Sequence, residues 1–395
     1  MAGIPELRHI VRKQIISPLQ AFLKDSRAMG FTLVVCTVVS LLVTNSSWGS
    51  HYLLFLEREI HFTDAIHLPH NLLHWINDGA MAVFFFLAGM EIKRELLVGE
   101  LSSLKKASLP VFGALGGMLV PALIFLLINR GNEFHSGWGI PMATDIAFSL
   151  GIASLLSNRV PLSLKIFLMA LAIIDDLGAI VVIAVFYGNA LQWIYLMGAL
   201  LLWGALALLT HVRKQSLPVT ILGGLALWYL VYQSGIHASI AGVLLAFVVP
   251  LQRLSNYVHA LHEGVYFIIL PLFALANTAI VLPDGGFQAL AHPLSWGVLC
   301  GLVIGKPLGI TLFCWLIIRR GWSQLPEATN WKQLWGISIL AGIGFTMSIF
   351  ITMLAFQSTD LQNIAKLAIL LAAVLSVLLG LLVFYSTSPP SGRSS

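Results

Sequence analysis

The sequence predicts an all-α, polytopic membrane protein that forms a single transmembrane domain over residues 1–395. Its composition is the first observation behind this prediction. Hydrophobic residues make up 58% of the chain and charged residues 10%, with a mean hydropathy of +0.89, whereas about 25% of a soluble domain is charged. The second observation is that apolar windows long enough to cross the roughly 30 Å hydrocarbon layer recur along the chain. They leave no room for a soluble domain of useful size.

Twelve such windows follow one another, so we expect 12 transmembrane helices. They fall at residues 29–45, 71–90, 108–129, 136–156, 162–187, 191–211, 219–234, 236–250, 258–281, 294–318, 332–355 and 363–385. Outside them, residues 1–28 form a basic segment and residues 45–70 form the longest external connection. Residues 386–395, with Pro389 and Pro390, form a tail that we expect to be disordered.

The basic residues are distributed asymmetrically between the two sides. With a cytoplasmic N-terminus, nearly all of the 22 Lys and Arg residues lie in cytoplasmic segments; the exceptions are Arg58, Arg130 and Lys366 outside, and Lys306 within a span. This asymmetry follows the positive-inside rule, and an even number of spans returns the C-terminus to the cytoplasm. The net charge of +5 forms no single patch, so the expected partner is the lipid bilayer and not nucleic acid.

Two spans contain residues that interrupt a helix. Pro141 and Asp145 lie at mid-depth in the fourth span, and Gly342 and Gly344 lie at a similar depth in the eleventh. Irregular backbone inside a membrane is tolerated where it lines a cavity, and such a pair of spans points to the site of a secondary transporter. Spans 3–5 and 10–12 are then counterparts. Their offset of seven spans is that of an inverted repeat.

Two adjacent carboxylates, Asp175 and Asp176, lie in the fifth apolar window without a basic neighbour. A carboxylate at bilayer depth costs several kcal/mol and normally serves an ion or proton route. Because neighbouring helix positions point about 100° apart, one aspartate can face a cavity while the other turns to a partner helix.

Lys306, in the tenth span, is the basic residue at depth and the natural counter-charge for one aspartate. A purely structural ion pair is the alternative, but it would need only one carboxylate. Oxygen ligands suit hard cations, and Asp145, Asp176, the Thr144 hydroxyl and freed carbonyls supply them. Carboxylates that accept either a cation or protons would couple the two flows by competition.

Six further polar residues lie in or beside the spans: Asp78, Glu91, Glu95, His237, His259 and His262. For each histidine, an interfacial position without function competes with a role in pH response. Asp78 either lies on an aqueous route or caps a helix.

Six motifs together resemble the NhaA sodium/proton antiporters of bacterial inner membranes, over about residues 22–384. These motifs are residues 85–96, Thr144-Asp145, Asp175-Asp176-Leu177-Gly178, Ser234-Gly235-Ile236-His237-Ala238, Gly305-Lys306-Pro307 and residues 342–350. The resemblance implies an electrogenic exchange of one Na⁺ or Li⁺ for two protons, with alternating access of one helix bundle against another. It also implies roles in pH and sodium homeostasis, and no cofactor.

The resemblance also implies roles for individual residues. Asp175 and Asp176 resemble the essential pair that binds Na⁺, and Lys306 resembles the lysine that pairs with Asp175. Thr144 and Asp145 resemble the unwound crossing, where Asp145 and Lys306 compensate helix dipoles of opposite sign.

The external connection, 45–70, resembles a β-hairpin that supports a homodimer, although its residues alone fit an extended hairpin or an interfacial helix. His237 resembles a histidine that tunes the pH profile, and His259, His262, Asp78, Glu91 and Glu95 are further candidates for the pH response. The short connection before the ninth span departs from the family, because Val258 precedes His259 where a glutamate is expected. We therefore expect the 251–263 segment to give a less steep alkaline activation.

Rival classes fit the sequence less well. Intramembrane aspartyl proteases carry a Gly-x-Gly-Asp signature that the chain lacks, and prenyltransferases need Asp-Asp-x-x-Asp, whereas Ala179 stands at the third position after Asp176. An enzyme is therefore not expected. A channel would not need a site coupled to protons. The alternative that stays open is another cation-coupled secondary transporter of the same inverted-repeat architecture.

Overall fold

The computed structural model describes residues 26–60, 68–156, 159–188, 190–212, 216–282 and 290–387. All regular elements in these ranges are helices, and one isolated antiparallel bridge joins Glu59 to Asn71. The basic segment up to residue 25, the central part of the external connection and the tail from residue 388 lie outside the described residues.

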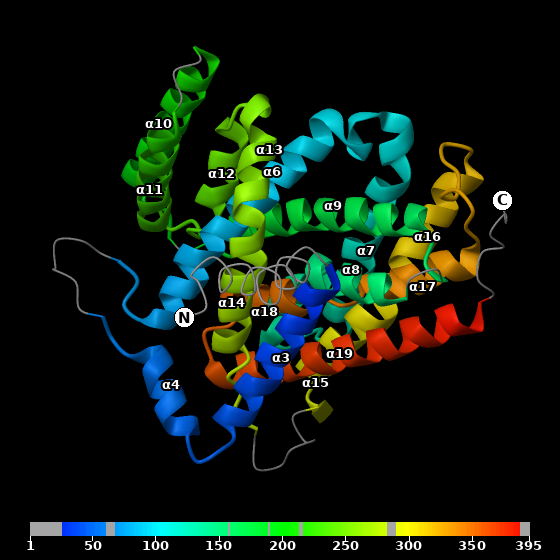
Figure 1. Cartoon of the computed structure of the whole chain (residues 1–395). Helices are drawn as coiled ribbons and strands as arrows, with labels where there is room; N and C mark the ends of the chain where they lie inside the picture. The colour runs from blue at the N-terminus through cyan, green and yellow to red at the C-terminus, as the bar shows by residue number, and fades with distance from the viewer. Residues whose placement is uncertain are drawn as a thin grey trace, which may run out of the picture.

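Figure 1 shows how the helices are arranged in space. The α-helices are α3 (Ser26–Thr44), α4 (Gly49–Glu57), α5 (Leu72–His74), α6 (Met81–Val98), α7 (Leu104–Ile128), α8 (Ile146–Leu155), α9 (Leu162–Phe186), α10 (Trp193–His211), α11 (Leu217–Gln233), α12 (Ile240–Val248), α13 (Leu251–Gly264), α14 (Leu270–Asn277), α15 (Pro293–Cys300), α16 (Lys306–Arg319), α17 (Trp331–Ala341), α18 (Phe345–Ala355) and α19 (Thr359–Ser386). The 3-10 helices are η3 (Glu100–Ser102) and η4 (Glu133–Met142), and the π-helical turns are η2 (Trp75–Ala80), η6 (Val265–Ile269) and η8 (Gly301–Gly305).

Length and composition identify fewer spans than the 12 windows of the sequence. Among the described residues, 7 helices are long and apolar enough to cross a membrane, or up to 9 if each of two bent pairs is one span. The shortfall has a physical reason: α6 carries four charged residues, α11 has 17 residues and α12 has 9. The protein is membrane-integral, and its apolar exposed surface, including Leu42, Leu201 and Leu382, is that of helices in lipid.

Glycines spaced four residues apart let α15, η8 and α16 lie directly against α7. A Cβ atom on Gly305 would lie 2.9 Å from the Pro121 Cα atom, and one on Gly309 would meet the carbonyl oxygen of Gly116. A Cβ atom on Gly116 would meet the carbonyl of Gly309 in turn. Small residues at such spacing are how membrane helices approach closely. The contact fixes the position of Lys306, the first residue of α16, relative to α7.

Replacing Gly309 with alanine is expected to destabilise the protein by about 1–3 kcal/mol, because the added methyl group overpacks the contact with α7. Gly204→Ala, in α10, is the matched control, since a Cβ atom there has nothing within 4 Å. The control should stabilise the helix by about 0.5–1 kcal/mol. Thermal unfolding in detergent measures both changes, and equal melting temperatures for the two variants would contradict the close approach.

A second, smaller hydrophobic core lies between α10, α11 and α12. Its buried residues include Ala199, Leu227 and Leu245, and it is separate from the main core. Figure 1 shows α10 and α11 at the margin of the molecule, with α12 and α6 between them and the other helices. Gly242 of α12 contacts α6 so closely that a Cβ atom would lie 2.8 Å from the backbone nitrogen of Phe86. The helices therefore form two packing units joined through α6 and α12.

The external connection begins with a helix. α4 covers Gly49–Glu57, and the backbone N–H of Ile60 then donates to the carbonyl oxygen of His70 at 2.7 Å beside the isolated bridge. The described part of the 45–70 connection thus contains one helix and one bridge, and residues 61–67 lie outside the described residues.

Candidate functional site

Two bent helix pairs meet at the centre of the molecule. η4 and α8 are bent by 44° across Ala143, Thr144 and Asp145, and α17 and α18 are bent by 45° across residues 342–344. The backbone N–H of Asp145 donates to the carbonyl oxygen of Ile343 at 2.7 Å, so the two breaks lie side by side. Four helix ends, each with unsatisfied backbone groups, therefore converge on one place.

Asp145 satisfies the two helix N-termini at this crossing. Its Oδ1 atom accepts from the Phe148 N–H at 3.0 Å, which caps α8. Its Oδ2 atom accepts from the Thr346 N–H at 3.0 Å and from the Thr346 hydroxyl at 2.5 Å, at the start of α18. A carboxylate is favoured there because helix N-termini carry partial positive charge. Both of its oxygen atoms are occupied by protein donors.

Lys306 and Thr144 lie at the two helix C-termini. The Lys306 ammonium, with an exposed fraction of 0%, donates to the carbonyl oxygen of Met142, the last residue of η4, and to Asp175 Oδ2 at 2.7 Å. The Thr144 hydroxyl lies 2.8 Å from Asp175 Oδ2 and 2.9 Å from the carbonyl oxygen of Ala341, the last residue of α17. One hydroxyl proton serves one acceptor at a time. A cation and a donor thus meet the negative ends of these helices.

The two aspartates of α9 face different surroundings. Asp175, with an exposed fraction of 1%, turns to Lys306 and Thr144, and Asp176, with an exposed fraction of 4%, lines a cavity. Within the described residues, the Oδ1 atom of each aspartate has no hydrogen-bond partner. A buried carboxylate oxygen without a partner carries a large desolvation cost, so a cation or a proton is the natural missing partner.

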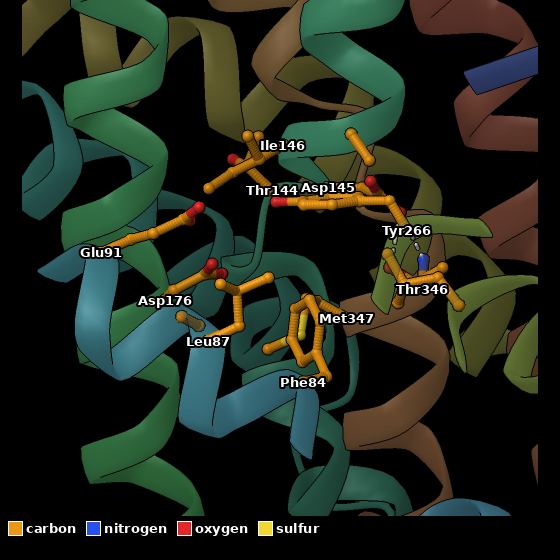
Figure 2. Close-up of a pocket in the computed structure, with 13 residues that line it drawn as sticks. Phe84, Leu87, Glu91, Thr144, Asp145, Ile146, Asp176, Tyr266, Thr346 and Met347 are labelled. Carbon is orange, nitrogen blue, oxygen red and sulfur yellow. Dashed lines mark hydrogen bonds between the residues drawn. The ribbon is translucent and has the colours of Figure 1, made fainter. Parts of the chain in front are cut away.

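The cavity beside Asp176 has a volume of about 20 Å³. This is room for one water-sized particle. Figure 2 shows its polar rim, formed by Asp176, Thr144, Asp145, Glu91 and Tyr266. All of these groups present oxygen atoms, the ligands that hard cations prefer. The arrangement can hold a single dehydrated monovalent cation or protons.

Comparison with known proteins agrees with this geometry. A model of the family described as Na⁺/H⁺ antiporter 1 matches residues 20–384. The chain belongs to this antiporter family. It is 48% identical to a protein named Na(+)/H(+) antiporter NhaA from Cytophaga hutchinsonii, over 91% of this chain and 93% of that protein. It is 46% identical to proteins of the same name from Sulfurovum sp. and Pectobacterium carotovorum, over 92% and 95% of this chain and 96% and 97% of those proteins.

In this antiporter-family chain, a second cavity lies next to the first. It has a volume of about 130 Å³ and is lined by Glu91, Arg94, His262 and Tyr266, among others. Glu91 also lines the small cavity. Glu95 does not line either cavity: it is buried, its Oε2 atom accepts from the Glu100 N–H at 3.1 Å, and its Oε1 atom lies 3.5 Å from Arg94 Nη2.

The histidines of the 251–263 segment lie on a helix. α13 begins directly after Pro250, so residues 254–257 are helical, where the sequence suggests a connection before the ninth span. His259 is exposed, whereas the His262 ring contacts the Tyr266 ring with centroids 4.5 Å apart. The structure thus brings His262 to a cavity and leaves His259 at the surface.

Asp78 and His237 form a separate pair. His237 Nε2 lies 3.1 Å from Asp78 Oδ1, and His237 Nδ1 lies 2.8 Å from the Ser239 hydroxyl. The imidazole packs edge-on against Phe350, with ring centroids 5.1 Å apart. The pair links η2 to the connection between α11 and α12, outside the lining of the Asp176 cavity.

Sequence reasoning missed two residues at this site. Thr346 lies within a motif of the resemblance without a role of its own, and only the distance from its hydroxyl to Asp145 identifies it. Tyr266 lies in the ninth apolar window, where a tyrosine is unremarkable. Its π-helical turn has one sequence signal, Pro271, which lacks the N–H that a regular helix would direct to residue 267.

Proposed function

We propose that this protein is an electrogenic antiporter that exchanges one Na⁺ or Li⁺ for two protons at Asp175 and Asp176. One observation carries the proposal: buried aspartate oxygens without protein partners among the described residues lie at and beside a cavity with room for one ion. Relatives named Na(+)/H(+) antiporter over nearly their whole length support the same activity.

Competition for the aspartates couples the two flows. A cation at the cavity must displace protons from the carboxylates, because the low-dielectric surroundings do not hold both positive charges. When the cation leaves, protons return to neutralise the same oxygens. Asp145 is already capped by Phe148 and Thr346, so its role is to compensate the helix dipoles. Because Asp145 and Thr144 also line the cavity, their side-chain oxygens complete the oxygen environment of the ion.

Alternating access is proposed to move one packing unit against the other. The separate core of α10, α11 and α12 supports such a division. We also propose 12 spans with both termini in the cytoplasm of a bacterial inner membrane. In this scheme η4–α8 and α17–α18 are the interrupted spans of two inverted repeats. Their similar bends of 44° and 45° support this assignment.

A homodimer through the 45–70 connection is a further part of the proposal. α4 and its flank expose the large apolar side chains of Trp48, Leu54 and Phe55, which suit a second copy of this chain. Light scattering of the purified protein measures the number of copies.

Transport in sealed vesicles tests the proposed exchange. Proteoliposomes with an acidic interior should lose their pH gradient when Na⁺ or Li⁺ is added outside, and K⁺ should have a smaller effect. The rate should rise when valinomycin and K⁺ abolish the membrane potential, because one positive charge moves inward for two that leave. Proton movement that needs no added cation, or current uncoupled from protons, would contradict antiport. Exchange of a different cation would favour another cation-coupled transporter of this architecture.

A further inference from the structure

The small cavity beside Asp176 and the larger cavity next to it share four lining residues. Two of them, Ile146 and Ala147, are apolar residues of α8, and the other two are Glu91 and Tyr266. The larger cavity reaches Arg94 and His262, so an ion that arrives from that end must pass Glu91 and Tyr266 before it reaches Asp176. The boundary between the cavities is therefore formed by one carboxylate, one tyrosine and two small or apolar side chains.

Tyr266 has an unusual position for a buried tyrosine. Only 7% of it is exposed, and its ring packs against the His262 ring. Its hydroxyl makes no hydrogen bond within the described residues. Figure 2 shows the ring edge-on across the cavity, between Thr346 and the side of the view that holds Glu91 and Asp176.

The helix around Tyr266 departs from regular geometry. η6 is a π-helical turn of five residues between α13 and α14. Such turns insert one extra residue into a helix and often lie at functional positions.

We propose that Tyr266 is the gate on the cation path between the larger cavity and Asp176, and that its hydroxyl oxygen contacts the ion as it passes. This inference rests on the proposed antiport function. The Tyr266 ring, in the position that the structure shows, closes the boundary between the two cavities. The small cavity has no room for a hydrated ion. The ion must therefore exchange its water for protein oxygens at this boundary. Glu91 and Tyr266 line both cavities, whereas Asp176 lines only the small one.

Thiol labelling tests whether the Tyr266 ring blocks access to the small cavity. Ala88→Cys places a reporter thiol in the small cavity and Leu150→Cys places one in the larger cavity. Both are made after the three native cysteines, Cys36, Cys300 and Cys314, are replaced by serine, in a protein whose melting temperature is unchanged by that replacement.

The two reporters should respond differently to the loss of the ring. In detergent without Na⁺, a small cationic methanethiosulfonate should label the small-cavity thiol at least tenfold faster after Tyr266→Ala, and at the original rate after Tyr266→Phe. The large-cavity thiol should react at the same rate whether tyrosine, phenylalanine or alanine occupies the gate position.

Equal labelling rates of the small-cavity thiol with Tyr266 and with alanine at this position would contradict the proposal that Tyr266 is a gate. If Tyr266→Ala does not fold, Tyr266→Leu provides the same comparison, because it also removes the ring. This experiment needs no transport, so its failure is distinguishable from failure of the antiport assay on the unmodified protein.

Transport kinetics test the proposed contact between the Tyr266 hydroxyl and the ion. Tyr266→Phe keeps the ring and removes the oxygen, so kcat/KM for Na⁺ should fall roughly tenfold, the usual effect of losing one contact to a charged group. Tyr257→Phe, at a half-buried tyrosine of the neighbouring α13 that lines neither cavity, is the matched control and should not change kcat/KM. An unchanged kcat/KM for Tyr266→Phe would overturn the contact with the ion.

Discussion

Replacement of Asp176 with asparagine is expected to abolish Na⁺-driven proton movement. The substitution keeps the size of the side chain and removes the negative charge that faces the cavity. A cation that enters the cavity would lose its charge partner, which costs about 3 kcal/mol or more in a buried site. Affinity should therefore fall by more than about a hundredfold. Proteoliposomes that contain the variant measure the loss directly.

The control for this prediction is another Asp→Asn substitution. Asp360 lies exposed in the first turn of α19 and does not line the cavity, so Asp360→Asn removes the same charge outside the site and should retain exchange. Exchange at the unmodified rate in the Asp176 variant would exclude competition at this carboxylate as the coupling mechanism.

Replacement of Lys306 with alanine is expected to affect stability more than it affects transport. The variant leaves Asp175 buried with the Thr144 hydroxyl as its partner and removes the donor to Met142. Loss of one member of a buried pair costs about 3–5 kcal/mol, and the melting temperature should fall by roughly 5–10 °C. The pH profile of exchange should shift, because the charge next to Asp175 is gone.

Two further variants give this prediction its controls. Lys306→Ala combined with Asp175→Asn leaves no unpaired charge, so it should recover part of the lost stability. Lys366→Ala removes a lysine that is 7% exposed in α19 and has no ion pair among the described residues, so it should cost less than Lys306→Ala. Equal melting temperatures for the two lysine variants would contradict the importance of the Asp175 pair.

The position of the site could be predicted because its residues are conspicuous in an apolar sequence. Asp175 and Asp176 are carboxylates in a long apolar window, and Gly342 and Gly344 fall where α17 and α18 are separated. These signals are local, because each depends only on one residue and its neighbours in the sequence. The resemblance added Asp175 as the partner of Lys306, and the two lie 2.7 Å apart.

The arrangement within the site could not be predicted in the same way. The aspartate that faces the cavity is decided by the rotation of α9 against α7 and α6, which the spacing of about 100° per residue leaves open. The sharing of Asp145 by Phe148 and Thr346 joins two helices that lie far apart in the sequence. Tyr266 and the pair of Asp78 with His237 likewise depend on distances between separate helices.

The length and composition of the helices identify fewer spans than the apolar windows of the sequence predict. α6 is a helix of the core although four of its residues are charged, because Lys93 donates to the carbonyl oxygens of Phe247 and Val249 and Glu95 accepts from the Glu100 N–H. A hydropathy window averages these charges and cannot register the groups that satisfy them.

The sharing of Asp145 has a mechanical consequence. One carboxylate holds the first turns of α8 and α18 together, so neither half-helix can swivel alone without leaving backbone donors bare in a dry interior. The two half-helices are thus linked through one shared side chain. Any tilt of one half-helix must therefore carry the other with it.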